Sequence, residues 1–193
     1  RRNTVYTVTL RRDIVDADVE LTVEPWRDGG STELEPDLDA LPTVDLERSE
    51  IPDEVTLAIS ISGCPNRCPG CHSPQLREDI GEPLTEEALT ALLERYRGAI
   101  TCVCLMGGDG DPQEVGRIAR FLHRQQTTPV KVGWYSGRQQ LPQGFSLEGF
   151  EYIKLGPYIE RLGGLKAPTT NQRLYRIGAD GTMQDITYRF QRN

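Results

Sequence analysis

The sequence predicts an α/β fold arranged as a partial, open barrel. Along residues 51–193, apolar runs rich in β-branched residues alternate with segments of helical periodicity, which is the pattern of a parallel sheet with crossover helices. Short loops rich in Gly, Cys or Ser follow three successive predicted strands, and ligands bind at the carboxyl ends of such strands. The stretch is also well short of the ~250 residues of a closed eight-fold barrel. We therefore expect an open core domain with one functional rim.

A β-rich extension is expected over residues 1–27. Residues 4–10 and 19–23 alternate between apolar and polar side chains, so they predict two strands that can pair as a hairpin. Residues 28–50 then combine Gly and Pro with many acidic residues, which predicts an acidic linker. We interpret this linker as a solvated tether, with docking to a partner as the alternative. A competing possibility is that the extension adds an edge strand to the sheet.

The first two core elements are a strand over residues 55–61 and a helix. The strand is a continuous apolar run that leads straight into a loop rich in Gly, Pro and Cys. Thr85 is a suitable helix cap, and the residues after it place Leu89 and Leu93 on one apolar face. Gly98 is expected to end the helix.

A second strand and a second helix follow. Residues 99–105 predict the strand, and the loop Gly107-Gly108-Asp109-Gly110 comes after it. Asp111 and Pro112 are suited to the cap and first position of a helix whose expected buried face is Val115, Ile118, Ala119 and Leu122. The remaining predicted strands are residues 130–134, 152–155, 174–177 and 184–188, the last two forming a hairpin.

Three cysteines at C-x3-C-x2-C spacing, Cys64, Cys68 and Cys71, follow the first strand directly. Thiolates so close in sequence suit an iron–sulfur cluster or zinc, but a closed structural site of either kind requires four ligands. His72 is not counted as the fourth, because adjacent residues seldom turn both side chains onto one metal. A 4Fe-4S cluster on three thiolates leaves one iron open, which makes it a reactive site. These three cysteines are therefore the predicted metal ligands.

The alternative for this motif is a zinc knuckle completed from elsewhere, for example by Cys102 or Cys104. These two cysteines lie two positions apart on one predicted strand, so they share a face. We interpret them as small buried hydrophobic residues, since free cysteine is commonly buried. The length of the cysteine string and the presence of other strand-end loops favour a cluster over zinc.

Composition argues against several classes of function. The net charge is −7 and no basic cluster stands out, which argues against a nucleic-acid partner. No apolar run approaches the roughly 20 residues of a membrane helix, and no signal-peptide pattern precedes the first strand, so no membrane association is expected. Five cysteines is an odd count, with three at metal spacing, so we expect a reducing, cytoplasmic location instead of a disulfide framework.

A family resemblance is carried by the string Gly63-Cys64-Pro65-Asn66-Arg67-Cys68-Pro69-Gly70-Cys71-His72-Ser73-Pro74. It resembles the activating proteins of anaerobic (class III) ribonucleoside-triphosphate reductases, in the radical S-adenosylmethionine superfamily. The resemblance runs from about Ile51 to the C-terminus, and its further strings are Met106-Gly107-Gly108-Asp109, Trp134-Tyr135-Ser136-Gly137, Tyr152-Ile153-Lys154-Leu155-Gly156-Pro157-Tyr158 and Thr170-Asn171-Gln172-Arg173. It implies the partial open (β/α) barrel of that superfamily, with a 4Fe-4S cluster and S-adenosylmethionine as cofactors.

The Gly-Gly-Asp loop is a predicted cofactor contact. Gly107 and Gly108 have no side chain to hold a ligand away, so their backbone can approach a small molecule closely. A tight turn is the alternative explanation of the two glycines. The resemblance implies that this loop, Gly107, Gly108 and Asp109, receives the amino group of S-adenosylmethionine. Asp109 replaces the family's more general Glu, so the backbone of Gly108 is favoured as the contact over the Asp109 side chain. Ser136 follows the next strand and is expected on the same rim.

The resemblance also implies that the adenosyl part of the cofactor rests beside Gly70, Cys71 and His72. Proton transfer by His72 is one interpretation, but a backbone or packing contact is favoured, because position alone supplies no base geometry. Lys154 and Tyr158 follow a strand on the expected rim, where they either contact the cofactor or partner or have a structural role.

The function that the resemblance implies is the activation of anaerobic ribonucleoside-triphosphate reductase. Reductive cleavage of S-adenosylmethionine at the cluster yields a 5′-deoxyadenosyl radical, which takes hydrogen from a glycine of the large reductase subunit. A flavodoxin- or ferredoxin-type reductant is implied, because the sequence has no second cluster motif. The alternatives are an activase of another glycyl radical enzyme, such as a formate-lyase type, and a non-catalytic zinc or iron–sulfur interaction module.

Overall fold

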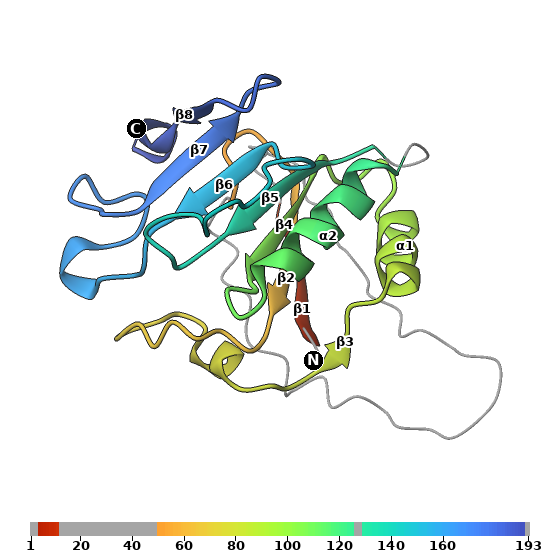
Figure 1. Cartoon of the computed structure of the whole chain (residues 1–193), viewed down its shortest axis with the longest axis horizontal. Helices are drawn as coiled ribbons and strands as arrows, with labels where there is room; N and C mark the ends of the chain where they lie inside the picture. Colours follow the sequence, from red (N-terminus) through yellow and green to blue (C-terminus); the bar gives the residue numbers. More distant parts are fainter. Residues whose placement is uncertain (1–3, 12–49, 126–128, 192–193) are drawn as a thin grey trace, which may run out of the picture.

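A computed structural model of the protein describes residues 4–11, 50–125 and 129–191. Within them, eight strands form one sheet in the order β3-β1-β2-β4-β5-β6-β7-β8, and the sheet is open because its two edge strands do not pair (Figure 1). The strands are β1 Thr4–Arg11, β2 Thr56–Ile61, β3 Glu82–Pro83, β4 Cys102–Gly107, β5 Lys131–Tyr135, β6 Tyr152–Leu155, β7 Arg173–Ile177 and β8 Met183–Asp185. The helices α1 Glu86–Arg95 and α2 Pro112–His123 lie over one face.

Four parallel strands form the centre of the sheet. β2, β4, β5 and β6 are neighbours in that order, and their registers pair Ile61 with Gly107, Met106 with Tyr135, and Tyr135 with Lys154. The four strands therefore end at about the same level. This parallel core confirms the predicted α/β class. β7 and β8 continue the sheet as the predicted antiparallel hairpin.

Both helices begin at the predicted caps. The Thr85 side chain accepts a hydrogen bond from the Ala88 amide at 3.2 Å, and Asp111 accepts one from the Glu114 amide at 3.1 Å. Such caps satisfy backbone donors that the first helical turn leaves without an intrahelical partner. Within the described ranges, neither helix is long and apolar enough to cross a bilayer.

Two strands are shorter than predicted. β4 begins at Cys102 and not at residue 99, because the preceding residues form the turn after α1, where the Ala99 amide donates to the Tyr96 carbonyl at 3.0 Å. β8 ends at Asp185, whose carboxylate accepts hydrogen bonds from the amide (2.8 Å) and the hydroxyl (2.6 Å) of Thr187. These local side-chain bonds compete with the ladder, so the chain forms the 3-10 turn η4, Thr187–Phe190, instead of more strand.

The N-terminal strand β1 belongs to the sheet. It pairs antiparallel with β2, from Val5 opposite Ile61 to Arg11 opposite Thr56, and its other side pairs with β3. Of the two possibilities raised by the sequence, the added strand is the one found for this part of the extension. Removing β1 would leave the outer backbone edge of β2 without a partner. The predicted strand at 19–23 and nearly all of the acidic linker lie outside the described residues.

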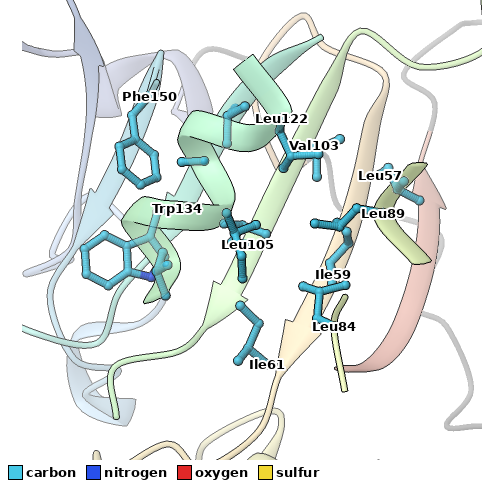
Figure 2. Close-up of a cluster of buried hydrophobic side chains, with 14 of the residues drawn as sticks. Leu57, Ile59, Ile61, Leu84, Leu89, Val103, Leu105, Leu122, Trp134 and Phe150 are labelled. Atoms are coloured by element: carbon cyan, nitrogen blue, oxygen red, sulfur yellow. The ribbon is translucent and has the colours of Figure 1, made fainter. Parts of the chain in front are cut away.

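The helix-covered face of the sheet carries the larger apolar core (Figure 2). Ile59 of β2 is fully buried there beside Leu89 of α1, and Leu122 of α2 packs near Val103 of β4. Trp134 of β5 is also fully buried, with its ring centroid 6.2 Å from that of Phe150. Each side chain of this size contributes roughly 1.5–3 kcal/mol on burial. This layer therefore supplies the rigid base on which the strand ends are held.

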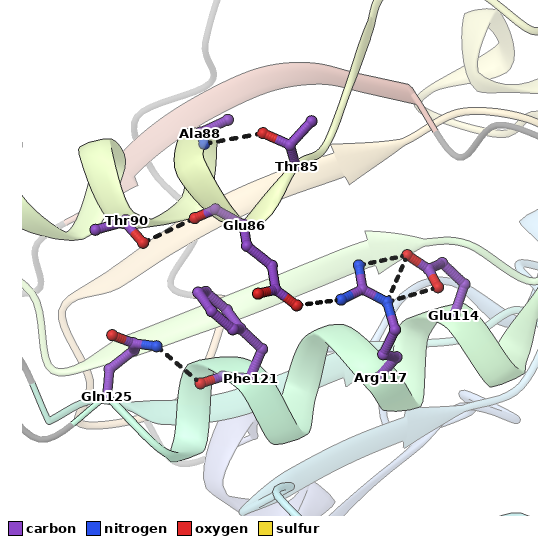
Figure 3. A network of polar contacts seen from close by, with 8 residues as sticks. All are labelled: Thr85, Glu86, Ala88, Thr90, Glu114, Arg117, Phe121 and Gln125. Carbon is purple, nitrogen blue, oxygen red and sulfur yellow. Dashed lines mark hydrogen bonds and ion pairs between the residues drawn. The ribbon is translucent and has the colours of Figure 1, made fainter.

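An ion-pair network joins the two helices on their outer side (Figure 3). The Arg117 guanidinium of α2 lies 2.7 Å from Glu114 on its own helix and 2.5 Å from Glu86 on α1. These side chains are partly exposed, so each pair contributes about 0–1 kcal/mol. The network therefore links the two helices but adds little to the stability of the fold.

The other face of the sheet carries a smaller cluster around Cys102 and Cys104 of β4 and Tyr152 of β6, packed with Ile51 and Leu174. Neither cysteine is exposed to solvent. Burial raises the pKa of both thiols, which keeps them protonated and apolar. The interpretation of these two cysteines as buried hydrophobic residues is confirmed.

A buried carboxylate, Glu54, joins the amino ends of the parallel strands. It is 6% exposed and accepts hydrogen bonds from Thr101 at 2.6 Å, from Tyr152 at 2.7 Å and from the Lys131 ammonium. Burial alone raises the pKa of Glu54, but the bonds from Lys131, Thr101 and Tyr152 together outweigh it, so the pKa lies below its ordinary value. We call this group of four residues the Glu54 brace.

Candidate metal and cofactor site

Four loops meet at the carboxyl ends of the parallel strands. They are residues 62–73 after β2, which we call the cysteine loop, residues 108–111 after β4, residues 136–138 after β5 and residues 156–160 after β6. In Figure 1 the cysteine loop leaves the arrowhead of β2 as the orange-to-yellow trace. Hydrogen bonds connect the first three loops, and ring packing connects the fourth to the cysteine loop. The prediction that the strand-end loops share one rim is confirmed.

Backbone hydrogen bonds hold the cysteine loop against the segment that follows it. The Cys64 amide donates to the Leu76 carbonyl at 2.8 Å, and the Arg77 guanidinium donates to the Cys68 carbonyl at 2.7 Å. Inside the loop, the Cys71 amide donates to the Cys68 carbonyl at 3.3 Å. Leu76 is buried and anchors the returning chain. The loop thus takes its shape largely from backbone acceptors, and the Cys64 thiol adds a contact to the Asn66 carbonyl at 4.0 Å.

The three predicted ligands, Cys64, Cys68 and Cys71, are free cysteines at intermediate burial. Burial raises the pKa of Cys64, and the negative charges of Asp109 and of the other two thiolates add to the rise, while a hydrogen bond with the Asn66 backbone opposes it. A bound metal cation would reverse this balance by stabilising the thiolate.

The donor set fits a cluster held by three thiolates in type and in number. The thiols are close enough to influence one another electrostatically, and none is committed to a disulfide. They do not converge as they stand: in the described part of the chain, no three Cys, His, Asp or Glu side chains are grouped so that they could hold a metal ion. Metal binding would therefore have to draw the side chains together on a loop whose backbone is already in place.

Asp109 lies buried between the cysteine loop and the end of β5, with 1% of its surface exposed. Its Oδ2 accepts hydrogen bonds from Asn66 Nδ2 at 2.6 Å and from the Gly137 amide at 2.8 Å. Its Oδ1 accepts one from the Ser136 hydroxyl at 2.5 Å. Both carboxylate oxygens are therefore engaged by the protein itself.

Arg138 completes the network around Asp109. Its guanidinium donates to the Asp109 carbonyl at 2.7 Å, and its Nε lies 3.8 Å from Asp109 Oδ1. Its amide donates to the Ser136 hydroxyl oxygen at 3.0 Å. Ser136 is fully buried, so its hydroxyl, predicted as a cofactor contact, stands between Asp109 and Arg138. Its place on the rim is as predicted; contact with a cofactor stays a prediction.

Gly107 and Gly108 both adopt left-handed backbone, with φ of 92° and 75°. A Cβ on Gly107 would lie 2.8 Å from the Ile61 carbonyl oxygen, and one on Gly108 would lie 2.5 Å from the Val115 side chain. In this structure the missing side chains make room for β2 and α2, which favours the tight-turn explanation of the two glycines. The Gly107 carbonyl also accepts from the Trp134 indole at 2.7 Å. A cofactor contact through the backbone of this loop stays a prediction.

Lys154 of β6 is buried beneath the rim. Its ammonium donates to the Gly156 carbonyl at 2.7 Å and to the Ser136 carbonyl at 3.3 Å, and it lies 5.9 Å from the centre of the Tyr135 ring. Burial lowers the pKa of Lys154 to about 8, although the negative charge of Asp109 acts in the opposite direction. The site therefore contains a buried cation behind the cysteine loop.

The far end of the cysteine loop packs on the loop after β6. The His72 ring lies 4.9 Å from the Tyr158 ring, centroid to centroid, at an angle of 58°. Gly70 has φ of 70°, and a Cβ there would meet Tyr158 at 3.4 Å and Glu160 at 3.6 Å. The favoured packing contact of His72 is thus observed, and Tyr158 is its partner. Contact of Gly70, Cys71 or His72 with a cofactor stays a prediction.

Sequence reasoning missed the roles of Gly137 and Arg138, and it left Lys154 unassigned. A Cβ on Gly137 would lie 2.6 Å from Asn66 Nδ2, so this glycine permits the approach of the cysteine loop. The only sequence signal for all three residues is that they follow or end a predicted strand on the rim. Comparison of the chain with protein-family models, with curated proteins and with solved structures gave no match.

Proposed function

We propose that the protein generates a glycyl radical on an anaerobic ribonucleoside-triphosphate reductase, as an activase of the radical S-adenosylmethionine type. The observation that carries the proposal is the place of the cysteine loop, whose three free cysteines directly follow the first parallel strand on the rim where such sheets bind ligands. The resemblance of residues 63–74 supplies the reaction class. Under this proposal, the four parallel strands belong to a partial (β/α) barrel of the radical S-adenosylmethionine type.

In the proposed activase, Cys64, Cys68 and Cys71 hold a 4Fe-4S cluster. The bound cluster and S-adenosylmethionine supply the one-electron chemistry, with electrons from a flavodoxin- or ferredoxin-type reductant. The protein's contribution is placement: the backbone at Gly108 and Gly70 is the proposed seat of S-adenosylmethionine on the rim. An open sheet suits a substrate that is itself a loop of another protein, because a closed barrel would restrict its entry.

The decisive test is electron paramagnetic resonance on anaerobically prepared protein, reduced and mixed with S-adenosylmethionine and the large reductase subunit. The expected result is a reducible cluster signal followed by a glycyl radical on the reductase. Cys64→Ala should abolish both signals, because no spare thiol lies in the motif. Cys104→Ala is the matched control: it removes a buried thiol of the other sheet face and should keep the cluster.

The same preparation separates the alternatives. Bound zinc with no iron and no acid-labile sulfide would indicate a non-catalytic interaction module and would overturn the proposal. A radical formed on a formate-lyase-type enzyme, and none on the reductase, would keep the chemistry but replace the partner.

A further inference from the structure

A single side-chain bond links the cysteine loop to the buried end of β4. Asn66 lies between Cys64 and Cys68 in sequence, and its amide donates to the Asp109 carboxylate at 2.6 Å. A hydrogen bond to an ionised acceptor is about twice as strong as one between neutral groups. Because Asp109 is 1% exposed, water is poorly placed to replace Asn66 as its donor.

Asp109 is held in place independently of the cysteine loop. The Ser136 hydroxyl and the Gly137 amide each donate to its carboxylate, at 2.5 and 2.8 Å, and Arg138 donates to its carbonyl at 2.7 Å. All of these partners come from the end of β5, next to β4 in the sheet. The carboxylate is therefore a fixed point to which Asn66 of the cysteine loop binds.

Two glycines allow the cysteine loop to come this close. A Cβ on Gly137 would lie 2.6 Å from Asn66 Nδ2, and a Cβ on Gly110 would lie 2.6 Å from the Gly63 carbonyl oxygen. Real Cβ atoms essentially never approach other heavy atoms below 3.0 Å. The cysteine loop thus packs directly against the two neighbouring strand-end loops. This close packing is possible only because both positions lack a side chain.

We propose that Asp109 is a positioning residue that, through Asn66, fixes the cysteine loop before any metal binds. This assignment rests on the proposed function only for the identity of the metal group that the three cysteines bind. It differs from the direct cofactor contact that the resemblance implies for this loop, because both carboxylate oxygens are already engaged. A loop fixed in advance loses less conformational freedom on binding, which raises its affinity for the metal.

The first experiment measures the alkylation of Cys64 and Cys68 by iodoacetamide in the metal-free protein, with the modified residues identified by mass spectrometry. Asn66→Ala and Asp109→Asn should each raise the rate about tenfold, since losing a bond to a charged group shifts local opening by that order. Asp111→Asn should react as the parent does, because the Asp111 side chain, on the same loop, accepts from the Glu114 amide at the start of α2.

Two further comparisons separate loop release from other effects. Asp109→Asn also removes a negative charge that acts on Cys64. Asn66→Ala and Gly137→Ala keep that charge, so they should still raise the rate if the loop is released. Gly164→Ala is the control for Gly137→Ala, because a Cβ at Gly164 meets nothing within 4 Å. The double variant of Asn66 and Asp109 should react no faster than Asp109→Asn alone, because both changes break one link.

The buried cysteines report whether a variant is still folded. Cys102 and Cys104 are fully buried, so they should stay unmodified in every variant that keeps its fold. Asn66→Ala removes a half-buried side chain of the loop, so it tests the proposal even if Asp109→Asn unfolds the chain. Parent-like alkylation of the loop cysteines in both Asn66→Ala and Gly137→Ala would overturn the assignment.

Metal binding supplies the second readout. Titration with Co²⁺, followed by its thiolate charge-transfer absorption, should show about tenfold weaker binding in Asn66→Ala than in the parent, because the loop must then be ordered by the metal. Equal binding in the two proteins would overturn the positioning role. A parent protein that passes both tests but assembles no iron–sulfur cluster would instead contradict the proposed function and leave the assignment of Asp109 in place.

Discussion

Two buried carboxylates lie at opposite ends of the same parallel strands. Glu54, at the amino ends, is 6% exposed and bonds to Thr101, Lys131 and Tyr152, all at or beside strand starts. Asp109, at the carboxyl ends, is 1% exposed and bonds to neighbouring strand ends and to the cysteine loop.

The difference lies in what each carboxylate holds. Every partner of Glu54 lies at the start of a parallel strand or directly before it, so the brace stabilises the fold. Asp109 bonds to residues that directly follow β5, but one further partner, Asn66, belongs to the cysteine loop, so this carboxylate transmits the position of the core to the proposed ligands. Burial and hydrogen bonding alone do not distinguish a structural carboxylate from a positioning one. The distinction lies in which element of the fold the carboxylate binds.

The largest expected effect is loss of the Glu54 brace. Glu54→Ala should lower the free energy of unfolding by about 4 kcal/mol, because it leaves buried donors without an acceptor and removes an ion pair. Chemical denaturation of the metal-free protein measures this. Glu94→Ala, which removes the exposed pair with Arg97, is the control and should cost about 0.5 kcal/mol or less. Equal losses in the two variants would mean that the brace does not stabilise the fold.

At the carboxyl ends of the strands, the buried charge of Lys154 should lower the stability of the folded protein at neutral pH, whereas the charge of Glu54 raises it. The pKa of Lys154 is about 8 in the folded protein and 10.5 ordinarily, so between these values the unfolded chain binds more protons and stability rises with pH. From pH 7 to pH 10.5 the parent should gain roughly 3 kcal/mol relative to Lys154→Met. Denaturation of both metal-free proteins across this range measures the difference. A constant difference would show that Lys154 is not a buried charge that destabilises the rim.

A smaller effect is expected at Asp111, which lies two residues from Asp109 but only caps α2. Asp111→Ala should lower the free energy of unfolding by about 1 kcal/mol, the usual loss for a helix cap. The alkylation rates of the loop cysteines should stay as in the parent. Faster alkylation of these cysteines in Asp111→Ala would mean that any disturbance of this loop releases them, and that Asp109 has no special role.

The smallest expected effect is the acid dependence of the Glu54 brace. The pKa of Glu54 lies below its ordinary value of 4.5, so its contribution is fully present above that value and is lost as the pH falls through the lower, folded pKa. The stability difference between the parent and Glu54→Gln should therefore be constant near neutral pH and shrink only below about pH 4.5. A difference that instead grows as the pH falls from about 6 toward 4.5 would indicate a carboxyl whose pKa is raised.

Local sequence patterns determined most of the framework. Thr85 and Asp111 marked the helix starts because capping depends on a side chain and on amides within three residues of it. The cysteine spacing and the apolar run before it located the proposed ligands at a strand end, since both signals lie within a short stretch. The alternation of strand and helix then placed the loops on one rim, because parallel strands end at one edge.

Only the tertiary structure decided how those loops are used. The approach of Asn66 to Asp109 joins residues 43 positions apart, and the Glu54 brace reaches Tyr152 across 98 positions. At Gly107 and Gly108 the missing side chains make room for Ile61 and Val115, a direction that only the packed neighbours reveal. Capping and periodicity depend on neighbours along the chain, and sequence therefore determined them. Burial and the partner of a buried charge depend on neighbours in space, which only the folded sheet brings together.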